Sequence, residues 1–121
     1  MIIRTLHAIP DDIQGYINVL LAGRPLPAIH IVDVGDGIWQ ALEGTHRLAA
    51  YKLAGKQPII IEVDFEENKD TPIIDIIGKT DGDNDIDPDM TLAEYVDKYY
   101  DGIDINFDGI FPALAGIVKI L

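Results

Sequence analysis

The chain has 121 residues, of which 48% are hydrophobic, and a formal net charge of −12. This length and apolar content favour one compact domain with its own core. The absence of cysteine excludes disulfides, thiolate metal sites and cysteine nucleophiles. The apolar runs are shorter than the ~20 residues that span a bilayer, and no signal-like segment precedes them, so we expect a cytoplasmic protein without membrane contact.

The acidic residues are concentrated in the second half of the chain. Residues 1–65 hold five Lys/Arg against seven Asp/Glu, a net charge of −2, and residues 66–121 hold four against fourteen, a net charge of −10. Such a surface repels a nucleic-acid duplex, and no stretch resembles a helix-turn-helix, so direct nucleic-acid binding is not expected. The same argument does not exclude a single nucleotide, because its phosphates need only one concave site with local positive charge.

The first half of the chain alternates strand and helix patterns. Residues 2–6 predict a short edge strand, and the spacing of apolar residues over 10–22 predicts an amphipathic helix. Residues 29–34 and 38–42 are typical of strands, and the Gly-Asp-Gly turn between them predicts a hairpin. A second helix opens after Gly44 and stops at Gly55.

The second half begins with a buried strand at residues 58–65, rich in isoleucine. Beyond it we predict a polar link (66–70), a strand or short helix (73–77), a polar loop (79–89), a helix (91–100) and a short strand or turn (101–108). Residues 111–121 form an apolar tail that must pack within the chain or serve as a homodimer surface.

The loop that opens the second helix has the composition of an anion pocket. Gly44 lets the backbone come close to a ligand, and Thr45 can cap the helix through its hydroxyl. His46 and Arg47 lie in the first turn, where the helix dipole prefers acids by about 0.3–1 kcal/mol per charge. An external anion bound to the free amides would remove this misfit. In the alternative interpretation Glu43 neutralises Arg47, and the pair is only structural.

This loop and its surroundings resemble the ParB/sulfiredoxin superfamily over residues 9–65. Small α/β domains of that superfamily carry a Gly-x-His-Arg type loop opening a helix, written here Gly44-Thr45-His46-Arg47 and followed by Leu48-Ala49-Ala50-Tyr51-Lys52-Leu53-Ala54-Gly55. The order of elements around the loop also agrees. The resemblance implies an α+β fold, a small mixed β-sheet packed by helices, within one domain, 1–121. Residues 1–65 would be its ParB/sulfiredoxin-like core, and residues 66–121 an acidic α/β C-terminal extension packed on it. Sulfiredoxin chemistry is excluded because Thr45 stands where those enzymes need cysteine.

The resemblance also implies a role for each residue of the loop. Gly44, Thr45, His46 and Arg47 would bind the phosphates of a nucleotide such as ATP, ADP or CTP, together with Mg²⁺. His46 could hydrogen-bond a phosphate or act as an acid. Glu43 could hold Mg²⁺ or accept a proton from a hydroxyl nucleophile, so Glu43 and His46 are the candidate catalytic residues.

Three further residues have two interpretations each. Arg24 could reach over the pocket as a second phosphate contact or remain a solvated loop arginine. Asp11 and Asp12 correspond roughly to a helix carboxylate used by related free serine kinases. Both are equally well explained as first-turn acids that complement the helix dipole, and for Asp12 we prefer this structural role.

The acidic loop resembles a calcium loop in spacing only. Five acids, Asp83, Asp85, Asp87, Asp89 and Glu94, fall at positions 1, 3, 5, 7 and 12 of an EF-hand pattern. Pro88 occupies the sixth position, where the sharp turn needs glycine. Thr91 to Glu94 instead form a capping box, so we expect a solvated loop. His7 and His30 lack partners at ligand spacing, and we expect a buried or edge role for His30. No protein metal site is predicted.

Two functions from different classes are consistent with these features. In the first, the protein binds a nucleotide or other phosphorylated ligand at residues 44–47, and any catalysis is phosphoryl transfer or nucleotide hydrolysis. In the second, it is a non-catalytic acidic interaction module that occupies a basic protein partner or imitates nucleic acid, and its phosphate loop is vestigial. A nuclease is less favoured, because substrate would approach against the acidic field.

Overall fold

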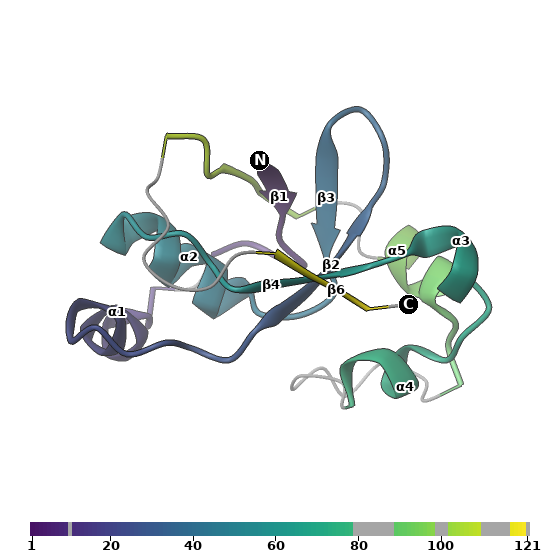
Figure 1. The fold of residues 1–121 in the computed structure, drawn as a ribbon, viewed down its shortest axis with the longest axis horizontal. Helices are drawn as coiled ribbons and strands as arrows, with labels where there is room; N and C mark the ends of the chain where they lie inside the picture. The colour runs from purple at the N-terminus through teal and green to yellow at the C-terminus, as the bar shows by residue number, and fades with distance from the viewer. Residues whose placement is uncertain (10, 79–88, 99–101, 110–116, 121) are drawn as a thin grey trace.

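A computed structural model describes residues 1–9, 11–78, 89–98, 102–109 and 117–120 (Figure 1). The strands are β1 (Ile2–Arg4), β2 (Ile29–Asp33), β3 (Ile38–Ala41), β4 (Ile60–Val63), β5 (Asp104–Asn106) and β6 (Ile117–Ile120). The helices are α1 (Gln14–Leu21), α2 (Thr45–Ala54), α3 (Phe65–Asn68), α4 (Ile73–Ile77) and α5 (Leu92–Lys98). They combine into one mixed sheet with helices at both of its ends.

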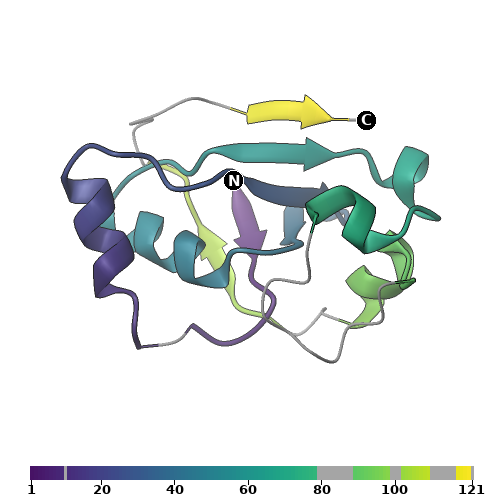
Figure 2. The same cartoon turned by 90° about the horizontal axis from the view of Figure 1, so that it is seen from below.

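The sheet has six strands in the order β5-β1-β3-β2-β4-β6. β1 is parallel to β3 and antiparallel to β5, β2 and β3 form the predicted antiparallel hairpin, and β2, β4 and β6 run in the same direction (Figure 2). The expected mixed α+β architecture is therefore confirmed. The prediction that residues 2–6 form an edge strand is wrong, because β5 pairs with the outer side of β1, with Ile3 opposite Ile105.

Two apolar cores cover opposite faces of this sheet. Along β2, Ile29 and Ile31 contribute to one core and Val32 to the other, as the alternation of side chains in a strand requires. The first core packs α1 and α2 on the sheet through Leu20 and Tyr51. The second core packs α4 and α5 through buried residues of the acidic half, namely Ile73, Ile77, Leu92, Tyr95 and Val96. The acidic half thus supplies apolar core as well as surface charge.

The start of α1 differs from the sequence-based expectation. α1 begins at Gln14, and its first turn contains no acid. Asp11 and Asp12 are exposed and precede the helix, so their predicted place in its first turn is wrong. The physical reason is a local turn in which the amide of Ile13 donates to the carbonyl of Asp11 over 3.2 Å, which delays the helix.

Residues 66–68 belong to the short helix α3 (Phe65–Asn68), where a polar link was predicted over 66–70. The Asp64 side chain caps α3 by accepting a hydrogen bond from the amide of Glu67 over 3.1 Å. Glu66 and Glu67 then lie in its first turn, where the helix dipole favours acids. Residues 73–77 are helical, which decides between the two predicted alternatives.

The capping box of α5 is confirmed. The Thr91 hydroxyl accepts from the amide of Glu94 over 3.3 Å, and the Glu94 carboxylate accepts from the amide of Thr91 over 3.2 Å. Asp83, Asp85 and Asp87, for which we expect a solvated loop, lie outside the described residues.

The end of the apolar tail docks on its own chain. β6 pairs in parallel with β4 and extends the sheet beyond it. In the described ranges, none of the helices has the length and apolarity needed to cross a membrane.

Candidate functional site

The N-terminus of α2 lies beyond the carboxyl ends of two parallel neighbours, β1 and β3. The register places Arg4 opposite Gln40, so both chains leave the sheet at the same edge. Ligands of α/β sheets gather at such edges. The amide of Leu6 donates to the Thr45 hydroxyl over 3.3 Å, which ties the chain after β1 to the start of α2. Topology alone therefore brings residues 5–7 and 43–46 together.

Gly44 begins α2 in a conformation that favours glycine. Its φ is 80°, and a Cβ built there would lie 3.1 Å from Cγ1 of Ile29 and 3.2 Å from Nη2 of Arg47. The loop is therefore pressed against β2 and against its own arginine. α2 has no side-chain cap and no acid in its first turn.

Thr45 does not have the predicted capping role. Its side chain is 2% exposed, and its hydroxyl accepts from Leu6 in the chain after β1. Gly44 occupies the cap position, so no hydroxyl is available there. Thr45 therefore joins β1 to α2 and does not cap the helix.

Arg47 points into the protein and binds three oxygens of its own chain. Nη1 donates to the carbonyls of Pro27 and Ala28 over 2.9 and 3.0 Å, and Nη2 donates to Glu43 Oε1 over 3.2 Å. The side chain of Arg47 is only 11% exposed. Of the two interpretations left open by the sequence, this geometry matches the ion pair of Arg47 with Glu43.

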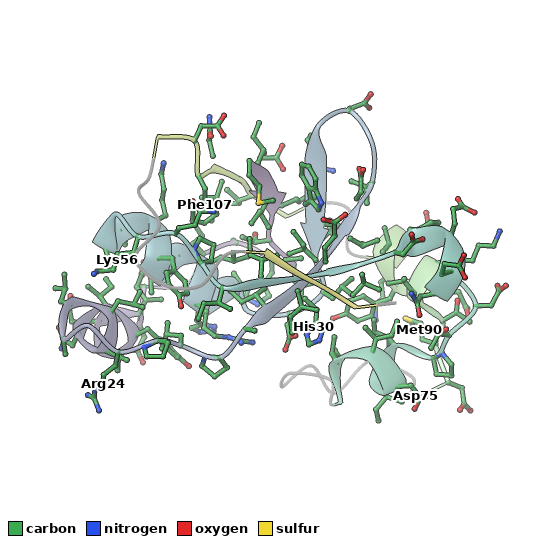
Figure 3. The ribbon with its side chains drawn as sticks, viewed as in Figure 1. Arg24, His30, Lys56, Asp75, Met90 and Phe107 are labelled. Carbon is green, nitrogen blue, oxygen red and sulfur yellow. The ribbon has the colours of Figure 1, made fainter. Side chains whose placement is uncertain are left out.

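Glu43 bridges Arg47 and a residue that sequence reasoning did not assign to the site, His30. The Nδ1–H group of His30 and its backbone amide both donate to Glu43 Oε2, the latter over 3.3 Å. Figure 3 shows His30 near the middle of the molecule, between the helices of its two ends. The hairpin register could have revealed this contact, because Ile31 pairs with Ala41, which places His30 opposite Leu42 and next to Glu43.

The bridge sets the charge state of Glu43. Burial raises the pKa of its carboxyl, but the hydrogen bonds from His30 and the positive charges of His30 and Arg47 outweigh burial and hold the pKa below its ordinary value. The carboxylate is 6% exposed and both oxygens accept hydrogen bonds. Glu43 is therefore placed to orient its neighbours. In the described part of the chain, no three His, Asp or Glu residues cluster as metal ligands.

Replacing Glu43 by glutamine should change how stability depends on pH. A carboxyl whose folded-state pKa is lowered stabilises the fold above its unfolded-state pKa, about 4.5, and this contribution disappears as the pH falls through the folded-state value. At pH 7 the free energy of unfolding of the variant should be about 2 kcal/mol lower than that of the wild type, because a charged hydrogen-bond acceptor is removed. The difference from wild type should shrink below pH 4.5.

Urea unfolding at a series of pH values from neutral to acid measures this effect. Asp12→Asn, which removes an exposed carboxylate, is the control and should change stability at neutral pH by less than about 0.5 kcal/mol. A difference between Glu43→Gln and wild type that stays constant with pH would contradict the assigned role of the bridge.

His46 lies at the start of α2 beside a second imidazole. Its ring centroid is 6.3 Å from that of His7 and 5.9 Å from that of Tyr16, and its side chain is partly exposed. Nδ1 of His7 donates to the carbonyl of Ala8 over 2.9 Å, so the bond to Ala8 uses one ring nitrogen and does not involve Nε2. Two imidazoles thus stand at the positive end of a helix that has no acid in its first turn.

Arg24 lies apart from these groups. It follows α1, is exposed, and in Figure 3 projects from the outer end of that helix away from the sheet. The structure therefore brings His30, Glu43 and Arg47 together in one cluster and His7, Tyr16 and His46 in another.

The fold and this loop define the class of protein as a small α+β domain with a mixed sheet and a glycine-led helix at its edge. Comparison of the chain with protein-family models, curated proteins and solved structures found no match.

Proposed function

We propose that the protein binds a nucleotide or another phosphorylated ligand at the N-terminus of α2. The observation that carries this proposal is the pair of imidazoles, His46 and His7, beside the start of α2, where the cap residue is Gly44 and the first turn holds no acid. Such a helix end attracts phosphate through its amides and its dipole. Protonated imidazoles would add charge and hydrogen-bond donors.

The resemblance of residues 9–65 to the ParB/sulfiredoxin superfamily supports the same site, and we propose a fold relationship to that superfamily. The roles that we propose for these residues differ from those that the resemblance implies. Arg47 fixes the loop to the start of β2, and Glu43 holds Arg47 and His30, so both position the loop and His46 takes the ligand. In this proposal Mg²⁺ enters with the phosphates of ATP, ADP or CTP. Any turnover would be phosphoryl transfer or nucleotide hydrolysis, with His46 as the proton donor.

A thermal-shift panel tests the proposal. ATP, ADP, CTP and GTP, each with and without Mg²⁺, should include a ligand that raises the unfolding temperature. At a hundred times its dissociation constant a ligand adds about 2.7 kcal/mol, which corresponds to several degrees in a domain of this size. His46→Ala should abolish the shift.

Arg24→Ala is the matched control, since it removes a cation beyond the end of α1, whereas Tyr16 at the start of α1 is the residue beside His46, and it should leave the shift intact. A panel in which no nucleotide stabilises the wild-type protein would reject the proposal. A shift that survives in His46→Ala would move the ligand to another surface.

A further inference from the structure

A groove lined by both apolar and acidic residues lies at the end of the sheet opposite the N-terminus of α2, where the parallel strands β2 and β4 end. It consists of two adjoining hollows of about 450 and 360 Å³, which share Asp33, Phe65 and Glu66. The register of Val32 with Val63 brings both strand ends to one edge, and α3 and α5 form the walls. We refer to this pair of hollows as the β2–β4 groove.

Four apolar residues line the larger hollow, and we call them the floor of the β2–β4 groove. It is formed by Val34 and Phe65, both partly exposed, and by Ala93 and Val96 of α5. Val34 and Phe65 pack against the second core from its outer side. Within the described residues the floor is therefore a continuation of the core onto the surface, where a further apolar group could be buried.

Among the described side chains, the charged groups on the rim of the groove are all acidic. Asp33, Glu66 and Asp97 line the larger hollow and Glu62 and Asp64 line the smaller one, and no lysine or arginine of the described part of the chain lines either of them. Lys69 approaches Glu66 over 3.6 Å, but both side chains are exposed, so this ion pair is weak and easily exchanged.

We propose that the β2–β4 groove docks a basic segment of a partner protein. One arginine or lysine of that segment would lay its aliphatic stem along Phe65 and Val96 and extend its charged head to Asp33 and Asp97. Long cationic side chains bury their stems on apolar surface in this way. The ring of Phe65 adds attraction for the cation, which carboxylates on the rim strengthen.

The combination of floor and rim selects this occupant over other cations. A bare metal ion needs converging ligands, and the described residues contain no such cluster. A polyamine offers a cation to the rim and a methylene chain to the floor, but it lacks the neighbouring apolar side chains that a peptide segment brings to the floor. A duplex of nucleic acid is repelled by the rim. The groove is separate from the N-terminus of α2, so this inference does not depend on the proposed phosphate site.

Fluorescence anisotropy with two labelled hexapeptides tests the inference. The probe alternates arginine with leucine, and its counterpart alternates glutamate with leucine. The full chain should bind the arginine peptide saturably and leave the glutamate peptide free. Asp33→Asn/Asp97→Asn should weaken binding about tenfold, because two ion pairs over apolar surface are lost.

The matched control is Asp11→Asn/Asp12→Asn, which removes two charges beside α1, at the opposite end of the molecule (Figure 1). Its affinity should stay within twofold of wild type. Equal weakening by both double variants would mean diffuse attraction and would overturn the inference. The same holds if spermidine displaces the peptide at equal concentration, or if the wild-type protein binds neither peptide.

Discussion

Replacement of Gly102 by alanine is expected to destabilise the protein by about 3 kcal/mol, because the new methyl group has no space. A Cβ at Gly102 would lie 1.5 Å from the carbonyl oxygen of Thr5, which is backbone and cannot rotate away. Thr5 and Ile103 hold the two segments together through hydrogen bonds of 2.9 and 3.0 Å. The chain must separate there, which weakens the pairing of β1 with β5.

Gly15→Ala in α1 is the control for this substitution. A Cβ at Gly15 meets nothing within 4 Å, so alanine should stabilise the helix by about 0.5 kcal/mol. Urea unfolding followed by circular dichroism compares both variants. If Gly102→Ala were as stable as wild type, the close approach of residue 102 to Thr5 would be wrong.

Arg47→Ala is expected to lower the free energy of unfolding by about 3–5 kcal/mol, the range for breaking a buried ion pair by removing one partner. The substitution leaves the nearly buried Glu43 carboxylate with His30 alone. It also leaves the carbonyls of Pro27 and Ala28 without the guanidinium that joins the start of β2 to α2. Arg47→Lys should recover part of the loss, since lysine keeps the charge but lacks the planar fork.

A double-mutant cycle with Glu43→Gln separates the interaction energy of Glu43 and Arg47 from other losses of stability. Because each residue's loss is dominated by the partner it leaves behind, the double variant should be less destabilised than the sum of the two single variants. A loss below about 1 kcal/mol for Arg47→Ala would identify a solvated surface arginine instead.

The position of Arg47 has a consequence for ligand binding. A guanidinium that already holds two carbonyls and a carboxylate cannot also grip a phosphate without breaking these bonds. Its effect on a ligand should therefore follow loss of stability, whereas the effect of His46→Ala should appear with stability retained. Measuring both quantities on both variants distinguishes a positioning residue from a ligand contact.

Much of the fold could be predicted from local patterns. Alternating β-branched residues located β2, and the Gly-Asp-Gly turn predicted its hairpin with β3; the three turn residues all have positive φ. Gly55 ends α2 in the left-handed conformation, as predicted. These features depend on backbone preferences of a few adjacent residues, which are visible in any single sequence.

Pairing between distant segments decided the parts of the fold that local patterns could not predict. β1 lies inside the sheet, and not at its edge, because β5, about a hundred residues away, pairs with it; no periodicity within residues 2–6 carries that information. The ion pair of Glu43 with Arg47 was foreseen as an alternative because Glu43 comes just before the turn that opens the helix of Arg47. The contact of Glu43 with His30 required the strand register, and the β2–β4 groove required α3 and α5 to fold over two strand ends.

The sequence by itself determined the mixed α and β composition, the hairpin, the glycine-led second helix and the excess of acid, because these follow from residue type and spacing. Only the tertiary structure decided which charges face each other. Arg47 turned toward Pro27, Ala28 and Glu43, and not toward solvent, because these oxygens converge where β2 starts and α2 begins. That convergence is a property of packed elements, since electrostatic energy depends on distances and burial that exist only in the folded chain.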